Sequence, residues 1–166
     1  MDLPLYFPLC TASRALRARR TGTETYSLQL IRHLLALESG HRFRLYCDRM
    51  PPGGLFSSGT SPELRVIPFP RLWTHARLSW EMLWQPPDVL FIPAHVLPLI
   101  HPRCAVVTIH DLGYLYYPEA HPRWQRTYLD WSTRWNAHQS AHLVVDSETT
   151  RADLVARYHV PAEKMT

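Results

Sequence analysis

The sequence predicts a doubly wound α/β domain with a mainly parallel sheet. Strand-like runs alternate with segments of helical period along the chain, and this alternation is typical of such domains. Two runs, 88–92 and 105–109, are short and continuously apolar, as expected of strands buried on both faces. The 166 residues, 46% hydrophobic and 19% charged, fit one domain with a well-buried core.

The remaining elements follow from local signals. Further strands are expected at 3–9, 42–47, 63–69 and 143–145, although Pro4 and Pro8 make the first a poor strand. A helix over 21–39 would begin at a capping-box pattern and end at Gly40. Its expected apolar face contains Tyr26, Leu30, Leu34 and Leu37.

Three more helices are expected further along the chain. They cover residues 72–84, a segment that starts near Pro122, and a segment capped by Ser147 that runs to about Tyr158. The second of them places four aromatic residues at helical spacing, Trp124, Tyr128, Trp131 and Trp135. We interpret this stripe as core or interface packing. Residues between His110 and Pro122 are expected to form a loop.

Charge, cysteine content and the length of the apolar runs limit the classes of function that fit this sequence. The net charge of +4 comes almost wholly from arginine; it permits contact with phosphates or phospholipid head groups and requires neither. The basic residues are not concentrated on one element, as they usually are in a protein that binds nucleic acid strongly. Cys10, Cys47 and Cys104 are odd in number and far apart, which predicts reduced, buried thiols in a cytoplasmic protein. The start of the sequence has no secretory signal pattern, and no apolar run approaches membrane-spanning length.

Candidate site residues lie where the predicted strands end, because ligands of open α/β sheets bind there. His110 and Asp111 follow the strand at 105–109. His110 could donate a hydrogen bond to a substrate hydroxyl or phosphate; alternatively, it packs at a strand end and Asp111 starts an Asx turn. We interpret His95 as a loop histidine and Ser147 as a helix cap.

The start of the first predicted helix is a second candidate. Gly22 and Thr23 could bring backbone N–H groups to a diphosphate, although a purely structural cap explains the pattern as well. Ten histidines are present, but none form a zinc-type pair within a predicted helix, so no metal site is expected.

Taken together, six stretches resemble the N-terminal half of the group 1 (GT4) retaining glycosyltransferases. They occur in the same order and spacing from about Thr21 to the end, at 21–26, 30–35, 87–98, 106–112, 144–154 and 160–164. The sequence departs from the pattern in two ways. Gly22 stands alone where the family often has more than one glycine, and the first strand lacks the usual Asp-x-Arg run after it.

The resemblance implies one half of a GT-B architecture of two Rossmann-like domains, with residues 1–166 as the N-terminal, acceptor-side domain. The donor-binding C-terminal domain is not in this sequence, so this chain alone should be inactive. The complete enzyme would transfer a sugar from a nucleotide sugar to an acceptor hydroxyl (on a glycan, lipid or small molecule) with retention, without a metal or other cofactor. His110 would be catalytic and contact the transferred sugar or acceptor, Gly22 and Thr23 would lie beside the donor phosphates, and His95, Asp111 and Ser147 would line the cleft.

Two other functions stay open at this point. The chain could be a non-catalytic Rossmann-like binding module, or part of another GT-B enzyme such as a sugar-nucleotide epimerase. We expect a cytoplasmic protein, with peripheral contact to the inner membrane face as an alternative, and no nucleic-acid partner.

Overall fold

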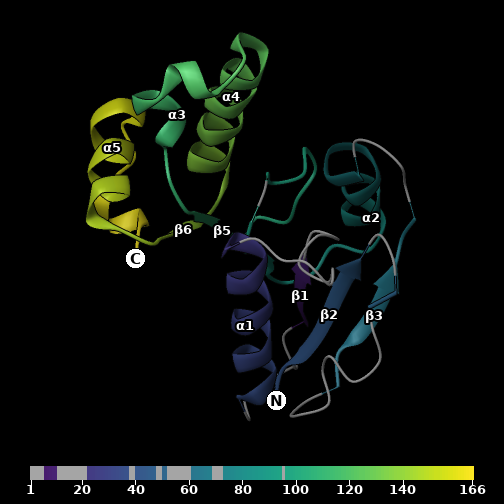
Figure 1. Cartoon of the computed structure of the whole chain (residues 1–166). Helices are drawn as coiled ribbons and strands as arrows, with labels where there is room; N and C mark the ends of the chain where they lie inside the picture. Colours follow the sequence, from purple (N-terminus) through teal and green to yellow (C-terminus); the bar gives the residue numbers. More distant parts are fainter. Residues whose placement is uncertain are drawn as a thin grey trace.

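A computed structural model describes residues 6–10, 22–37, 40–47, 50–51, 61–68, 73–94 and 96–166. Its centre is a six-stranded sheet in the order β3-β2-β1-β4-β5-β6, and every strand pairing is parallel (Figure 1). The strands are β1 Tyr6–Cys10, β2 Arg42–Cys47, β3 Glu63–Val66, β4 Leu90–Ile92, β5 Ala105–Ile109 and β6 His142–Val145. The predicted fold class is therefore confirmed.

The strand order reverses direction between β1 and β4, which defines a switch point at the sheet centre. Ligands of doubly wound domains bind at such a point, beyond the carboxyl ends of the strands. β1 is central even though Pro8 lies within it and supplies no N–H to the ladder. Its pairing with β2 nevertheless extends from Tyr6 to Cys10.

Helices follow the predicted order. They are α1 Gly22–Ala36, the π-helix η2 Trp73–Leu78 continuous with α2 Ser79–Trp84, α3 Gly113–Tyr116, η3 Pro118–Ala120, α4 Arg123–Gln139, α5 Glu148–Tyr158 and η4 Ala162–Lys164. The expected loop between His110 and Pro122 therefore contains two short helices, α3 and η3. Ser147 caps α5 as predicted, since its Oγ accepts the backbone N–H of Thr150 at 3.1 Å.

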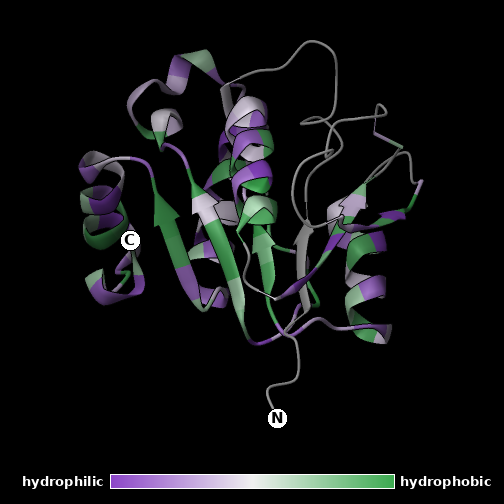
Figure 2. Ribbon diagram, turned by 90° about the horizontal axis from the view of Figure 1, so that it is seen from below, coloured by the Kyte–Doolittle hydropathy of each residue, from purple (hydrophilic) through white to green (hydrophobic). Residues whose placement is uncertain are grey.

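Alternating residues of β2 show that the sheet is covered on both faces. Phe43, Leu45 and Cys47 pack with α1 in one core cluster, whereas Tyr46 belongs to the other. That second cluster combines strands β4 to β6 with residues of α2, α4 and α5. The period of two along a strand assigns these residues to opposite faces. Figure 2 shows the corresponding pattern, with hydrophobic strands and helices that are hydrophilic on their outer sides.

The predicted apolar face of α1 is only partly right: Leu34 packs against the core cluster beside β2, but Leu37 does not. Leu37 is 58% exposed, and the helix ends at Ala36, before Gly40. The residues that pack on β2 are offset from the predicted stripe: Leu28, Ile31 and Leu35. Leucine and isoleucine surround much of this helix, so the sequence offers two stripes of helical spacing and docking on the sheet selects one. Thr21, the start of the expected capping box, lies outside the described residues.

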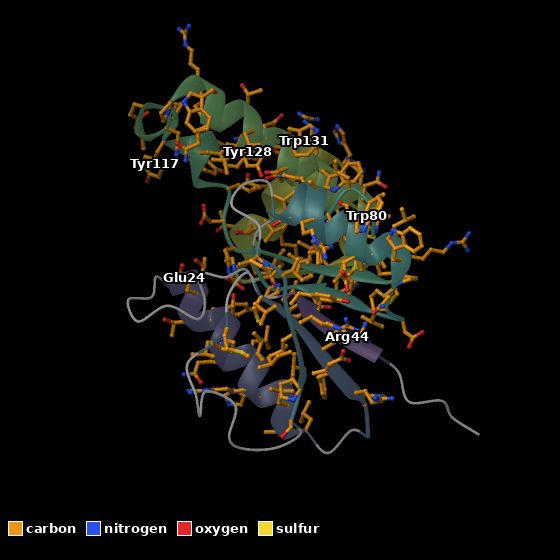
Figure 3. All side chains as sticks on the ribbon, turned by 90° about the vertical axis from the view of Figure 1, so that its right-hand side faces the viewer. Glu24, Arg44, Trp80, Tyr117, Tyr128 and Trp131 are labelled. Carbon is orange, nitrogen blue, oxygen red and sulfur yellow. The ribbon has the colours of Figure 1, made fainter. Side chains whose placement is uncertain are left out.

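The aromatic stripe of α4 is core at one position only, since Trp135 packs against the main core cluster and the other three rings do not. Trp124, Tyr128 and Trp131 are 73%, 42% and 41% exposed. Tyr128 and Trp131, labelled on α4 in Figure 3, also contact the ring of His75 in η2. The helix instead turns small and polar residues inward, namely Ser132, Thr133, Asn136 and Ala137. Interface packing is therefore the better description of Tyr128 and Trp131, which meet η2 through His75.

Cysteine burial was also only partly predicted. Cys47 is buried and reduced, but Cys104 is exposed in the connection before β5; the side chain of Cys10 lies outside the described residues. Within the described part of the chain, no helix is both long and apolar enough to cross a membrane.

Candidate functional site

His110 lies at the carboxyl edge of the sheet, directly after β5. Its Nδ1 is 2.5 Å from Oδ2 of Asp146, and its Nε2 is 2.9 Å from the backbone oxygen of Pro93. Pro93 follows β4 and Asp146 follows β6. Because the carboxyl ends of parallel strands meet at one edge, three neighbouring strands bring these groups together beside the switch point.

The side chain of His110 is held by a well-defined set of contacts. The ring of Tyr26, from the second turn of α1, meets the imidazole edge-on with centroids 4.8 Å apart. Thr150 in α5 donates its hydroxyl to the backbone oxygen of His110 at 3.3 Å. The side chain is 17% exposed, so part of it remains accessible. Elements from both sides of the switch point therefore fix this one residue.

The two partners of the imidazole ring determine its hydrogen-bonding state in this arrangement. A carboxylate and a carbonyl oxygen only accept hydrogen bonds, so both ring nitrogens donate when both bonds form. Nε2 becomes available to a ligand only when it leaves the Pro93 carbonyl.

Gly22 and Thr23 are exposed at the start of α1. A Cβ atom at Gly22 would meet no heavy atom within 4 Å, so packing against the described residues does not require glycine there. The carbonyl of Thr23 accepts the hydroxyl of Ser27 at 2.8 Å. Tyr26 on the same helix touches His110, so the first two turns of α1 lie at the same edge of the sheet. Their contact with a donor stays a prediction.

Asp111 and Ser147 act locally on the backbone. Asp111 Oδ1 accepts the N–H of Gly113 at 2.8 Å, which is the Asx-type turn considered above. Ser147 caps α5, and its Oγ also contacts the Thr150 hydroxyl at 3.0 Å. Their proposed ligand roles are untested, and His95 lies outside the described residues.

Sequence reasoning missed three groups that define the site: Asp146, Tyr26 and the Pro93 carbonyl. Asp146 directly follows β6, so the rule that selected His110 would also have selected it. The contact of Tyr26 with His110 carries no comparable signal, because it depends on how α1 docks. Among the described residues, no three His, Cys, Asp or Glu side chains are grouped as a metal site.

The strand order and the polar groups at its switch point define a Rossmann-like ligand-binding domain. Residues 20–166 match the family model described as Glycosyltransferase Family 4, and the chain belongs to this family. This match confirms the glycosyltransferase family that the sequence resembles. A search of curated proteins gave no match.

Proposed function

We propose that this domain is the acceptor-side half of a GT-B enzyme that transfers a sugar from a nucleotide-sugar donor to an acceptor hydroxyl with retention. The observation that most supports the proposal is the position of His110. It is a partly accessible donor at the switch point of a glycosyltransferase-family domain. Sites of this topology bind their ligands at that point.

In the proposed reaction, His110 is a positioned hydrogen-bond donor. When a ligand oxygen replaces the Pro93 carbonyl, the Nε2–H contacts the transferred sugar or the acceptor. Negative charge then builds on the departing diphosphate, and a preorganised donor nearby lowers the barrier. Asp146 is a positioning residue, because its carboxylate holds the ring through Nδ1. Backbone N–H groups at the start of α1, at Gly22 and Thr23, would face the donor phosphates.

Other parts of the proposal concern the complete enzyme. A donor-binding domain would hold the nucleotide and supply the basic groups that neutralise the leaving diphosphate, so no metal is needed. The reaction would take place in the cytoplasm.

A specific observation favours a second candidate function. Both ring nitrogens of His110 are already bonded within the domain, as in a histidine that only ties strand ends together. On this alternative the domain is a non-catalytic binding module.

One experiment separates the two. The full-length gene product is incubated with a panel of nucleotide sugars, and release of the nucleoside diphosphate is followed. The anomeric configuration of any product is then determined by NMR. Retained configuration with diphosphate release is the expected result. An inverted product contradicts retention, and absence of release with every donor, with and without candidate acceptors, favours the binding module.

A further inference from the structure

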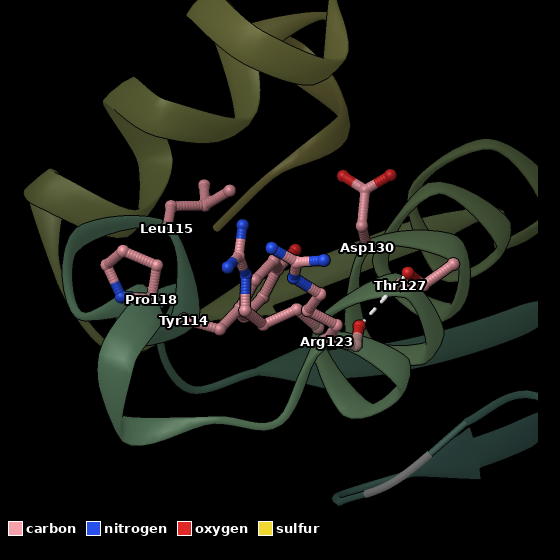
Figure 4. Close-up of a pocket in the computed structure, with 7 residues that line it drawn as sticks. Tyr114, Leu115, Pro118, Arg123, Thr127 and Asp130 are labelled. Atoms are coloured by element: carbon pink, nitrogen blue, oxygen red, sulfur yellow. Dashed lines mark hydrogen bonds between the residues drawn. The ribbon is translucent and has the colours of Figure 1, made fainter.

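A hollow of about 670 Å³ lies between the short helices α3 and η3 and the first two turns of α4. Figure 4 shows Leu115 and Pro118 on one side and Arg123, Thr127 and Asp130 of α4 on the other. Tyr114 and Arg126 complete the lining. This volume is within the usual range for small-molecule sites. None of these residues belongs to the candidate site around His110.

Two cations in this hollow lack a counter-charge. Arg123 and Arg126 are three residues apart on α4, so their side chains leave the same side of the helix. In the described part of the chain, neither guanidinium forms an ion pair, whereas Arg77 and Arg134 each do. Two unpaired guanidinium groups in one concave site create a local positive field.

The one carboxylate in the lining does not cancel that field. Asp130 accepts Arg134 Nε at 3.0 Å through Oδ2 and the Tyr158 hydroxyl at 2.9 Å through Oδ1. Its negative charge is therefore paired with Arg134, which does not line the hollow. Arg134 also lies over the Tyr158 ring, 5.2 Å from its centroid, so this pairing has a fixed geometry.

Tyr114, which lines the hollow, is held by hydrogen bonds. The hydroxyl of Tyr114 is 2.6 Å from that of Tyr158 and donates to Thr133 at 3.0 Å. These bonds join α3, α4 and α5, and burial raises the pKa of both tyrosines, so the phenols stay neutral. A fixed, neutral tyrosine in a lining with two arginines is preorganised for an anion and does not repel it.

We propose that this hollow binds a phosphoryl group through Arg123 and Arg126. A planar guanidinium presents paired N–H donors that match phosphate oxygens, and the hollow has room for more than the phosphate itself. The inference goes beyond the proposed function, because phosphate binding here does not require sugar transfer.

The phosphoryl group could come from a lipid head group or from a soluble phosphorylated molecule. The surroundings favour the lipid: Trp124 and Tyr117, next to the lining residues in sequence, are 73% and 64% exposed. Tryptophan and tyrosine are enriched where membranes meet water. Both sources share the same phosphate chemistry, and the test below distinguishes them.

The test uses the whole chain and two probes. Calorimetry measures binding of inorganic phosphate and phenyl phosphate, and co-sedimentation measures binding to phosphatidylcholine vesicles with and without phosphatidic acid. Arg123→Gln and Arg126→Gln are compared with Arg103→Gln, which removes the same charge from an exposed position outside the hollow. Circular dichroism melts confirm that each variant is folded.

We expect either Arg123→Gln or Arg126→Gln to weaken binding about tenfold or more, the usual effect of losing a hydrogen bond to a charged group, and Arg103→Gln to leave it unchanged. Dependence on phosphatidic acid alone identifies the lipid as the source, and binding of phenyl phosphate alone identifies a soluble ligand. The proposal is overturned if no probe binds, if the pocket variants bind like the wild type, or if Arg103→Gln weakens binding equally.

Discussion

Removing the carboxylate of Asp146 should release the His110 ring from its position and lower the free energy of unfolding. The contact is a charge-assisted hydrogen bond at 2.5 Å, and such bonds contribute about 1.5–3 kcal/mol when protected from water. The Asp146 side chain is 37% exposed, so solvent screening reduces the value. We therefore expect a coupling free energy of about 1 kcal/mol between the two side chains.

A double-mutant cycle measures this coupling. The free energies of unfolding of His110→Ala, Asp146→Ala and the double variant are compared with the wild type by denaturant titration. Glu119→Gln, which removes one charge at an exposed position in η3, is the control for net charge and should show no coupling with His110. A coupling of zero within error for His110 and Asp146 would refute the paired arrangement of the site.

Three further predictions concern packing, pH and metal. Trp131→Ala should lower the free energy of unfolding by about 1–2 kcal/mol. This is less than the roughly 2–5 kcal/mol expected for Leu143→Ala, because Leu143 is fully buried. An equal loss for the two variants in denaturant titrations would place Trp131 in the core. Burial lowers the pKa of His75 below 6.5, so the unfolded state takes up a proton first on acidification. Protonation of His75 in the unfolded state should therefore lower the melting temperature as the pH falls below about 6.5. A His75→Gln variant whose melting temperature falls with acid as much as that of the wild type would contradict this. Transferase activity of the complete enzyme should survive EDTA; loss that magnesium or manganese restores would show a metal requirement.

The sheet was predictable because its signal is local. The runs that became β4 and β5 are apolar enough to be recognised without knowing their neighbours, and Ser147 caps α5 through a bond three residues away. The π-helix at Trp73–Leu78 and the short helices α3 and η3 have no such signal. Their backbone follows from contacts with other elements.

Predictions that depended on which helix face meets the sheet were less accurate. The aromatic spacing of α4 is real, but the helix docks through Asn136, whose side-chain oxygen accepts the N–H of Leu97 at 2.9 Å. Trp135 of the stripe donates its indole N–H to the backbone oxygen of the same Leu97 at 3.1 Å, so a polar and an aromatic residue dock this helix together. The site shows the same limit, because His110 was predictable from its strand, whereas its contact with Tyr26 depends on how α1 packs.

If His110 contacts the reacting groups, turnover must fall when its imidazole is removed, so the decisive measurement is the turnover of a His110→Ala variant of the complete enzyme. The rate is measured per folded molecule, well below the melting temperature, with His121→Ala as a histidine control outside the site. A positioned acid–base or donor group contributes about 10²- to 10⁴-fold, so we predict a loss of turnover in that range while His121→Ala retains the wild-type rate. A folded His110→Ala enzyme with undiminished turnover would show that His110 has no role at the reaction centre and only joins strand ends.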